Sequence, residues 1–245
     1  MRASTKGTKL AAMTGPITLA GFDADDTLWQ NEAFFRLTQD RFVALLEGYA
    51  PPDHLAVRLL AAERRNLGHY GYGVKGFVLS MIETAIEVTE GRVPATVIAE
   101  IMAAGREMLA YPIELLPHAR AAVEAAAARF HVVLITKGDL LDQERKLAQS
   151  GLGHLFHGVE IVSEKTADVY SRLFMRHGAR AQSALMVGNS LKSDVLPVIA
   201  AGGIGIHVPQ AFTWELERAD PPRGHPRFLE LPDLGGLAPV LDRLA

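Results

Sequence analysis

Two aspartates, Asp23 and Asp25, directly follow a short apolar segment that has the length of a buried strand. Side chains alternate along an extended backbone, so residues two apart point to the same side. Clustered carboxylates need a cation, and in a chain without cysteine the available ligands are oxygen atoms. Because Mg²⁺ prefers oxygen ligands, the pair predicts a Mg²⁺ site.

The next two apolar segments end in groups that suit phosphate. Thr136, Lys137 and Gly138 close the first of them, and Lys165 follows the second. A hydroxyl, the backbone N–H groups of a Thr-Lys-Gly turn and an ammonium group can together bind the oxygens of a phosphoryl group. These residues predict a phosphoryl site.

Asn189 and Asp194 follow a further apolar segment. In a doubly wound sheet, ligands bind beyond the carboxyl ends of the strands, where all of these residues would meet. A carboxylate beside a phosphoryl group can attack phosphorus and form an aspartyl phosphate. A neighbouring carboxyl can then act as the acid for the leaving oxygen and as the base for water. The set therefore predicts phosphoryl transfer to a carboxylate.

The elements that must position these residues alternate between strand and helix. Short aliphatic segments bounded by turn residues are typical of strands buried on both faces. They span 17–22, 131–135, 158–162, 183–187 and 203–208. Helical patterns stand between or after them at 117–129, 140–150, 166–177 and 194–200. This alternation predicts an α/β fold with a doubly wound parallel sheet.

Residues 31–112 interrupt the alternation, because they contain no convincing strand. Proline and glycine breaks divide them into successive predicted helices near 31–47, 53–67, 74–89 and 94–110. We expect a helical cap domain inserted between the two parts of the core, residues 17–30 and 113–245. Residues 1–16 are expected to form a flexible tail.

Four motifs stand in order along the chain. FDADDTLW at 22–29 contains DxDxT, and VVLITKG at 132–138 ends an apolar strand in threonine. SEKTAD at 163–168 places a lysine at the start of a helix, and MVGNSLKSD at 186–194 ends a strand in a glycine with spaced polar residues. With this ordered set the chain resembles the haloacid dehalogenase (HAD) superfamily. The resemblance covers most of residues 17–208 and implies a HAD-like core with a helical cap after the first strand.

The resemblance also implies a role for each matched residue. Asp23 would be the nucleophile and a Mg²⁺ ligand. Asp25 would be the general acid and base, with its backbone carbonyl on the metal. Thr136 and the N–H of Lys137 would hold the phosphoryl oxygens, and Lys165 would neutralise charge between Asp23 and the phosphate.

The fourth motif would complete the metal shell with Asn189 and Asp194. Asn189 stands where the family usually has Asp, so the site loses one negative charge. Affinity for Mg²⁺ should then fall, unless Asp194 becomes a direct ligand. Asp26 replaces the family's usual Gly and is expected to add a further acid near the mouth of the site.

The inserted cap of this family closes over the site and selects the substrate, as lids generally do. Residues 64–77 combine four glycines with charged and aromatic side chains, and glycine lets backbone approach a ligand closely. We expect substrate contacts from Arg65, Tyr72 and Lys75. The alternatives are an ordinary helical corner with solvated charges, or a Schiff-base role for Lys75 as in the related phosphonatases.

Composition narrows the classes of function. The 245 residues are 49% hydrophobic, carry a formal net charge of −3 and include no cysteine. Disulfides and thiol chemistry are excluded. We expect a cytoplasmic protein, monomeric or homodimeric, that takes a small phosphorylated metabolite and binds neither nucleic acid nor membrane.

The combined prediction is a Mg²⁺-dependent phosphatase of a small soluble phosphomonoester, acting through an aspartyl phosphate. Two alternatives stay open. One is a metal-independent 2-haloacid dehalogenase in which Asp23 attacks carbon, although that chemistry needs no acid at Asp25. The other is a phospho-ligand binding module without turnover, which only Asn189 favours.

Overall fold

A parallel sheet covered on both faces by helices forms the core of the protein, and the predicted α/β fold is confirmed. The computed structural model describes residues 15–244, so the predicted tail lies outside the described residues except for its last two. Six strands lie in the order β3-β2-β1-β4-β5-β6. They are Leu19–Phe22 (β1), His131–Lys137 (β2), Gly158–Val162 (β3), Ala184–Gly188 (β4), Ile204–His207 (β5) and Phe228–Glu230 (β6).

The period of two along each strand divides the core between the two faces of the sheet. In β2, Val132 and Leu134 pack on one face, and Val133 and Ile135 pack on the other. Helices Ala119–Ala127 (α5) and Leu237–Leu244 (α9) contribute to the first face, beside Leu140–Ser150 (α6). Helices Ala167–Arg176 (α7) and Leu196–Ala201 (α8) cover the second. Both faces are buried, which explains the nearly continuous apolar runs of the strands.

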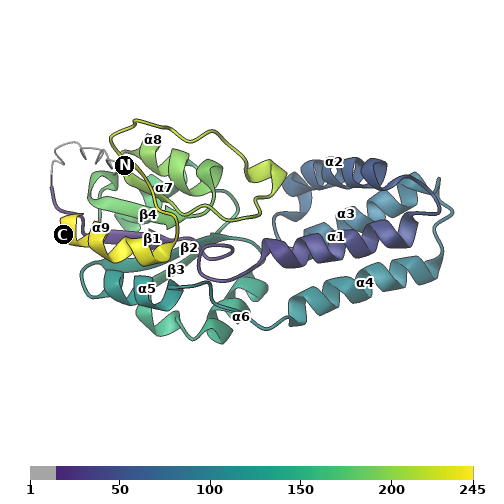
Figure 1. Cartoon of the computed structure of the whole chain (residues 1–245), viewed down its shortest axis with the longest axis horizontal. Helices are drawn as coiled ribbons and strands as arrows, with labels where there is room; N and C mark the ends of the chain where they lie inside the picture. Colours follow the sequence, from purple (N-terminus) through teal and green to yellow (C-terminus); the bar gives the residue numbers. More distant parts are fainter. Residues whose placement is uncertain (1–14, 245) are drawn as a thin grey trace, which may run out of the picture.

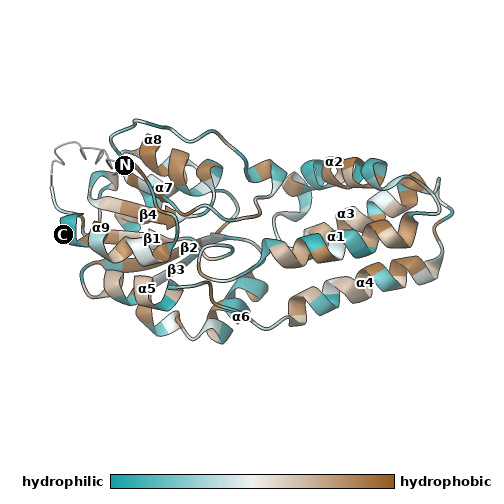
Figure 2. Ribbon diagram, viewed as in Figure 1, coloured by the Kyte–Doolittle hydropathy of each residue, from teal (hydrophilic) through white to brown (hydrophobic). Residues whose placement is uncertain are grey.

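Four helices inserted after β1 form a separate bundle beyond one end of the sheet (Figure 1). They are Glu32–Leu46 (α1), Pro52–Tyr70 (α2), Val74–Val88 (α3) and Ala95–Ala110 (α4), close to the predicted bounds. They enclose their own apolar core, which includes Phe42, Leu59 and Met81. In Figure 2 the hydrophobic residues recur on the strands and along the inner sides of these helices. We call this bundle the cap.

Two elements of the core differ from the sequence-based expectation. The helix predicted at 194–200 is a π turn, Leu191–Val195, followed by α8. The edge strand β6 was not predicted, because three residues are too few to show an alternating pattern. The connection between β5 and β6, residues 209–227, runs from the sheet out to the cap and back (Figure 1). We call this connection the strap.

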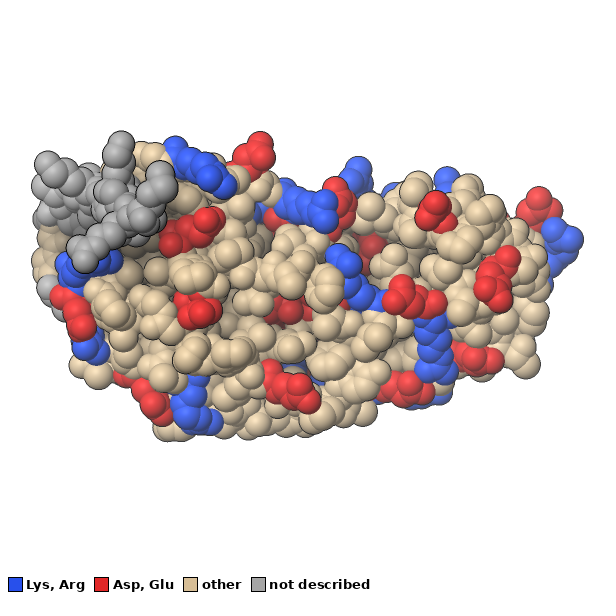
Figure 3. All heavy atoms as spheres, in the orientation of Figure 1, with Lys and Arg blue, Asp and Glu red and all other residues tan. Residues whose placement is uncertain are grey.

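The outer surface mixes charges of both signs. Figure 3 shows lysine and arginine side chains interspersed with aspartate and glutamate on the face in view. Within residues 15–244, none of the helices has the length and apolarity required to cross a bilayer.

Candidate active site

A buried lysine joins two carboxylates that come from opposite ends of the sequence. Asp23 follows β1, and its backbone N–H donates to the Val187 carbonyl of β4 at 2.9 Å, which places it at the carboxyl edge of the sheet. Lys165 Nζ lies 2.5 Å from Asp23 Oδ1 and 2.7 Å from Asp194 Oδ1. Tertiary structure therefore brings together the first, third and fourth motifs around one ammonium group.

Burial and mutual contact shift the pKa values of Asp23 and Lys165. Burial and the nearby charge of Asp194 raise the pKa of Asp23, and Lys165 opposes them. Burial by itself lowers the pKa of Lys165, but the carboxylates of Asp194 and Asp23 outweigh it and raise that pKa. Lys165 is therefore charged, and its charge stabilises the ionised form of Asp23 that a nucleophile requires.

Asp25 also faces the site, but helix α6 holds its carboxyl group. Its Oδ1 accepts from Trp29 Nε1 at 2.7 Å and from Lys146 Nζ at 2.9 Å. Its Oδ2 accepts from Gln143 Nε2 at 2.7 Å. Sequence reasoning missed Gln143 and Lys146, although their spacing of three puts them on one face of α6. These contacts fix the orientation of Asp25 toward the cavity.

Asp26 lines the cavity, as expected, but its side chain hydrogen-bonds to the backbone at the start of the cap. Its φ of 57° lies in the left-handed region, which explains why the resembling family usually has glycine here and why aspartate is tolerated. Its carboxylate accepts the backbone N–H groups of Asn31 and Glu32 at the start of α1. The Asp26 carboxylate thus caps the N-terminus of the first cap helix.

Thr27 links the first motif to the fourth. Its hydroxyl is 2.9 Å from Asp23 Oδ2 and 3.3 Å from Asn189 Oδ1, and it accepts the Asn189 N–H at 3.0 Å. Asp194, in contrast, has no exposed surface, and its Oδ2 accepts the Ser190 N–H. Both Asp194 oxygens are therefore occupied by this chain's own donors.

Only a few side chains of the site could bind Mg²⁺ directly, but their oxygen atoms suit it. In residues 15–244, no three histidine, aspartate or glutamate side chains converge as a metal site. The Asp23 carboxylate and the Asn189 amide oxygen both line the cavity and share the Thr27 hydroxyl, so they lie close together; backbone carbonyls and water would complete the shell. Mg²⁺ is commonly held by one or two carboxylates and keeps several waters, so this set suits it.

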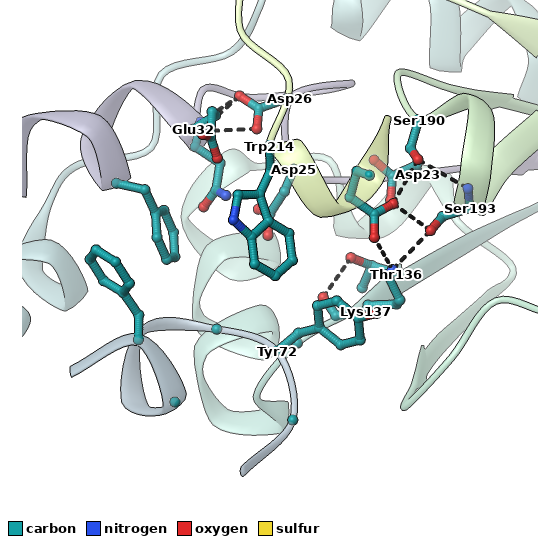
Figure 4. A pocket seen from close by; sticks show the side chains of 18 of the residues that line it. Asp23, Asp25, Asp26, Glu32, Tyr72, Thr136, Lys137, Ser190, Ser193 and Trp214 are labelled. Carbon is teal, nitrogen blue, oxygen red and sulfur yellow. Dashed lines mark hydrogen bonds and ion pairs between the residues drawn. The ribbon is translucent and has the colours of Figure 1, made fainter. Parts of the chain in front are cut away.

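Thr136 and Lys137 end β2 at the cavity, as predicted, but the Lys137 side chain has its own acidic partner. Lys137 Nζ lies 2.7 Å from Glu217 Oε1 and 2.8 Å from Ser193 Oγ, as Figure 4 shows for Lys137 and Ser193. Glu217 Oε2 accepts from Ser190 Oγ at 2.6 Å. Glu217 belongs to the strap, and no local motif in the sequence marked it. Gly138, whose φ is 139°, also lines the cavity next to Lys137.

Of the three cap residues expected to contact substrate, the structure brings only Tyr72 to the cavity. Tyr72 lines it and its hydroxyl hydrogen-bonds Glu164 of the core. Arg65 instead pairs with Glu83 at 2.7 Å on the cap surface. Lys75 pairs with Asp139 at 2.9 Å, and its side chain is 57% exposed. Neither Arg65 nor Lys75 lines the cavity, because each is held by an acidic partner outside it.

The cavity lies between the core, the cap and the strap and encloses about 170 Å³. Its core side holds Asp23, Asp25, Thr136 and Lys165. The strap adds Phe212, Trp214 and Glu217, which sequence reasoning missed, and α1, α2 and α3 add further side chains. The cap and the strap therefore form the walls that a substrate meets beyond the reacting atoms.

Comparison with known proteins agrees with this architecture. The haloacid dehalogenase-like hydrolase family matches residues 17–202. A haloacid dehalogenase-like family hydrolase from Xanthomonas campestris is 46% identical, with 97% of this chain and 96% of that chain covered and a TM-score of 0.84. No curated protein sequence matches the chain.

More distant structures share the fold. A Bacillus subtilis HAD-hydrolase, YfnB, bound to magnesium, is 17% identical over 93% of this chain and 100% of that one, with a TM-score of 0.63. A predicted phosphoglycolate phosphatase from Haemophilus somnus is 16% identical over 95% and 100%, also with a TM-score of 0.63. Solved structures of haloacid dehalogenases have similarly low sequence identity and similar TM-scores.

Proposed function

The chain belongs to the haloacid dehalogenase-like hydrolases, and on that premise we propose that it is a Mg²⁺-dependent phosphatase of small soluble phosphomonoesters. The observation that carries the proposal is the pair Asp23 and Asp25 at one cavity, with Asp23 ion-paired to buried Lys165. A nucleophile, a second carboxyl group and a fixed positive charge are what phosphoryl transfer through a carboxylate requires.

The proposed reaction has two steps. An Asp23 oxygen attacks phosphorus, the ester P–O bond breaks, and the leaving alkoxide takes a proton from the Asp25 carboxyl. Water then attacks the aspartyl phosphate and gives a proton to Asp25, which frees phosphate and regenerates Asp23. The Thr136 hydroxyl and the Lys137 N–H hold the transferring oxygens, and Lys165 balances the charge that accumulates beside Asp23.

Asp23, the Asp25 carbonyl and Asn189 would hold the Mg²⁺ ion. When bound, Mg²⁺ would supply positive charge to the phosphoryl oxygens and to the Asp23 carboxylate. Asp194 has a different role in this proposal, because its hydrogen bonds to Lys165 and to the Ser190 N–H direct its charge toward the lysine. Asp194 is thus a positioning residue for Lys165.

The proposal is tested by phosphate release from a generic aryl phosphate, with Mg²⁺ and with EDTA, for the parent protein and Asp23→Asn. We expect turnover only in the parent with Mg²⁺. Equal turnover in both proteins would overturn the nucleophile assignment. Halide release from 2-chloropropionate in EDTA would favour a dehalogenase instead. Stabilisation by inorganic phosphate without hydrolysis of any ester would favour a binding module.

A further inference from the structure

The part of the cavity beyond the reacting atoms has aromatic walls. We call it the outer chamber. It is lined by the rings of Phe35, Tyr72, Phe77, Phe212 and Trp214. Phe35 and Phe77 of the cap lie 5.1 Å apart between ring centroids, and the Trp214 ring of the strap meets Tyr72 edge-on at 6.1 Å. Figure 4 shows the Trp214 ring standing beside Asp25, between the cap and the core. Ring faces of this kind attract organic cations.

Two glutamates of the cap lie in the same chamber. Glu32 and Glu63 both line it, and Glu63 lies close to Trp214. The pKa of each is raised to about 7, mainly by burial; for Glu32, Arg36 opposes this rise and the charge of Glu63 adds to it. Arg36 is 3.7 Å from Glu32, and its guanidinium covers the Phe212 ring from outside the chamber. Within residues 15–244, Glu63 has no ion-pair partner.

The cations that line the cavity are already paired with acids of this chain. Lys165 binds Asp23 and Asp194, Lys146 binds Asp25, and Lys137 binds Glu217. The described lining contains no arginine and no histidine. Lys137 Nζ also lies over the Tyr72 ring at 3.9 Å, so that ring face already holds a cation of this chain. An acidic group on the substrate would therefore meet carboxylates and rings in the outer chamber, and the cations at its edge are already held by acids of this chain. A positive group would meet both of its usual partners.

We propose that the alcohol half of the phosphomonoester carries an ammonium group, which binds in the outer chamber between Glu63 and the ring of Trp214. This inference rests on the proposed phosphatase function and names its substrate class: the phosphate ester of a small amino alcohol. The ammonium group takes no part in the bond changes at phosphorus. It places the ester so that phosphorus lies at Asp23, which is a positioning effect.

The test compares three phosphate esters of similar size in the presence of Mg²⁺. Phosphocholine carries a quaternary ammonium group, 3,3-dimethylbutyl phosphate replaces that nitrogen with carbon, and phosphoglycolate carries a carboxylate. We expect kcat/KM for phosphocholine to exceed that for the neutral ester by about tenfold or more, since one desolvated charge contact is worth about that factor. Glu63→Gln should reduce this ratio toward one. Glu83→Gln, on the outer surface of the cap, should leave the ratio unchanged.

The outcomes separate the inference from the function. Hydrolysis of an aryl phosphate combined with equal rates for the charged and neutral esters, or with a preference for phosphoglycolate, overturns the ammonium site and leaves the phosphatase intact. If no ester is hydrolysed, the phosphatase proposal fails. Calorimetric titration of phosphocholine then decides the site. Binding that weakens about tenfold in Glu63→Gln supports it, and equal or absent binding in both proteins overturns it.

Discussion

At the scale of single residues, the site departs from its family pattern in two places that the structure explains differently. Asp26 occupies a left-handed backbone position and starts helix α1, so its carboxylate serves the fold. Asn189 is hydrogen-bonded to Thr27, which also contacts Asp23, so a change of charge here would act on the proposed Mg²⁺ site. The two substitutions look alike in sequence, because both exchange the family's usual residue in a motif, but only the second bears on the proposed Mg²⁺ site.

We predict that Asn189→Asp lowers the Mg²⁺ concentration needed for half-maximal aryl phosphate hydrolysis by about tenfold, because it restores one negative charge near the cation. Asn189→Ala should raise that concentration, since it removes the amide oxygen. The measurement is initial rate against Mg²⁺ concentration for the three proteins. An unchanged or higher requirement in Asn189→Asp would show that this position lies outside the metal shell.

At the scale of elements, the end of β4 and the π turn after it form one packed unit. A Cβ atom added at Gly188 would lie 2.3 Å from Asp194 Cγ, so the strand end has no room for a side chain. The turn Leu191–Val195 points Asp194 inward and Ser193 toward the strap. The close approach of these two elements is what delivers the second carboxylate to Lys165.

Gly188→Ala should therefore displace Asp194 and leave Lys165 and Asp23 imperfectly paired. We expect a loss of about 3 kcal/mol or more in the free energy of unfolding, as for other broken buried ion pairs, and a large loss of phosphatase turnover. Gly68→Ala is the matched control. Gly68 lies in helix α2 with no heavy atom near its missing Cβ, so alanine should stabilise by about 0.5–1 kcal/mol and keep turnover. Urea unfolding and phosphate release measure both. Equal stability of the two variants would contradict the packing argument.

At the scale of the whole molecule, the cavity joins three parts that are distant in sequence. Cap and core meet through Tyr72 with Glu164 and through Lys75 with Asp139. Gly73, with a φ of 109°, lets the cap corner pass within contact of Asp139. The strap completes the enclosure with Trp214 against Glu63 and Glu217 against Lys137. Buried carboxylates at this junction couple the stability of the molecule to pH.

The free energy of unfolding should fall as pH rises from about 4.5 to about 7, in part through Glu63. Its folded-state pKa is raised from 4.5 to about 7, so in this window the folded chain holds a proton that the unfolded chain has lost. Glu63→Gln should remove this pH dependence. Its free energy of unfolding relative to the parent should therefore increase by on the order of 2 kcal/mol as the pH rises from 4.5 to 8. Glu83→Gln, whose parent carboxyl has a lowered pKa through Arg65, should show no such gain. Urea unfolding at both pH values measures the effect, and a constant difference across pH would contradict it.

Much of this architecture was predictable because local patterns specify it. Short apolar segments bounded by turns located five of the six strands, and amphipathic spacing located the four cap helices. The strand-end motifs predicted which residues gather at the cavity, since parallel strands share one carboxyl edge. Arg65 and Lys75 show the limit. Their type and spacing matched a substrate contact, but acidic partners outside the cavity hold both side chains.

The sequence by itself determined the alternation of strand and helix, the inserted cap and the acids and lysines at the strand ends, because each depends on neighbours within a few residues. Tertiary structure alone decided that Lys165 joins Asp23 to Asp194, that Gln143 and Lys146 hold Asp25, and that the strap brings Glu217 and Trp214 to the cavity. These contacts join segments separated by tens to more than a hundred residues. Their partners are chosen by packing and charge in three dimensions, which no local pattern records.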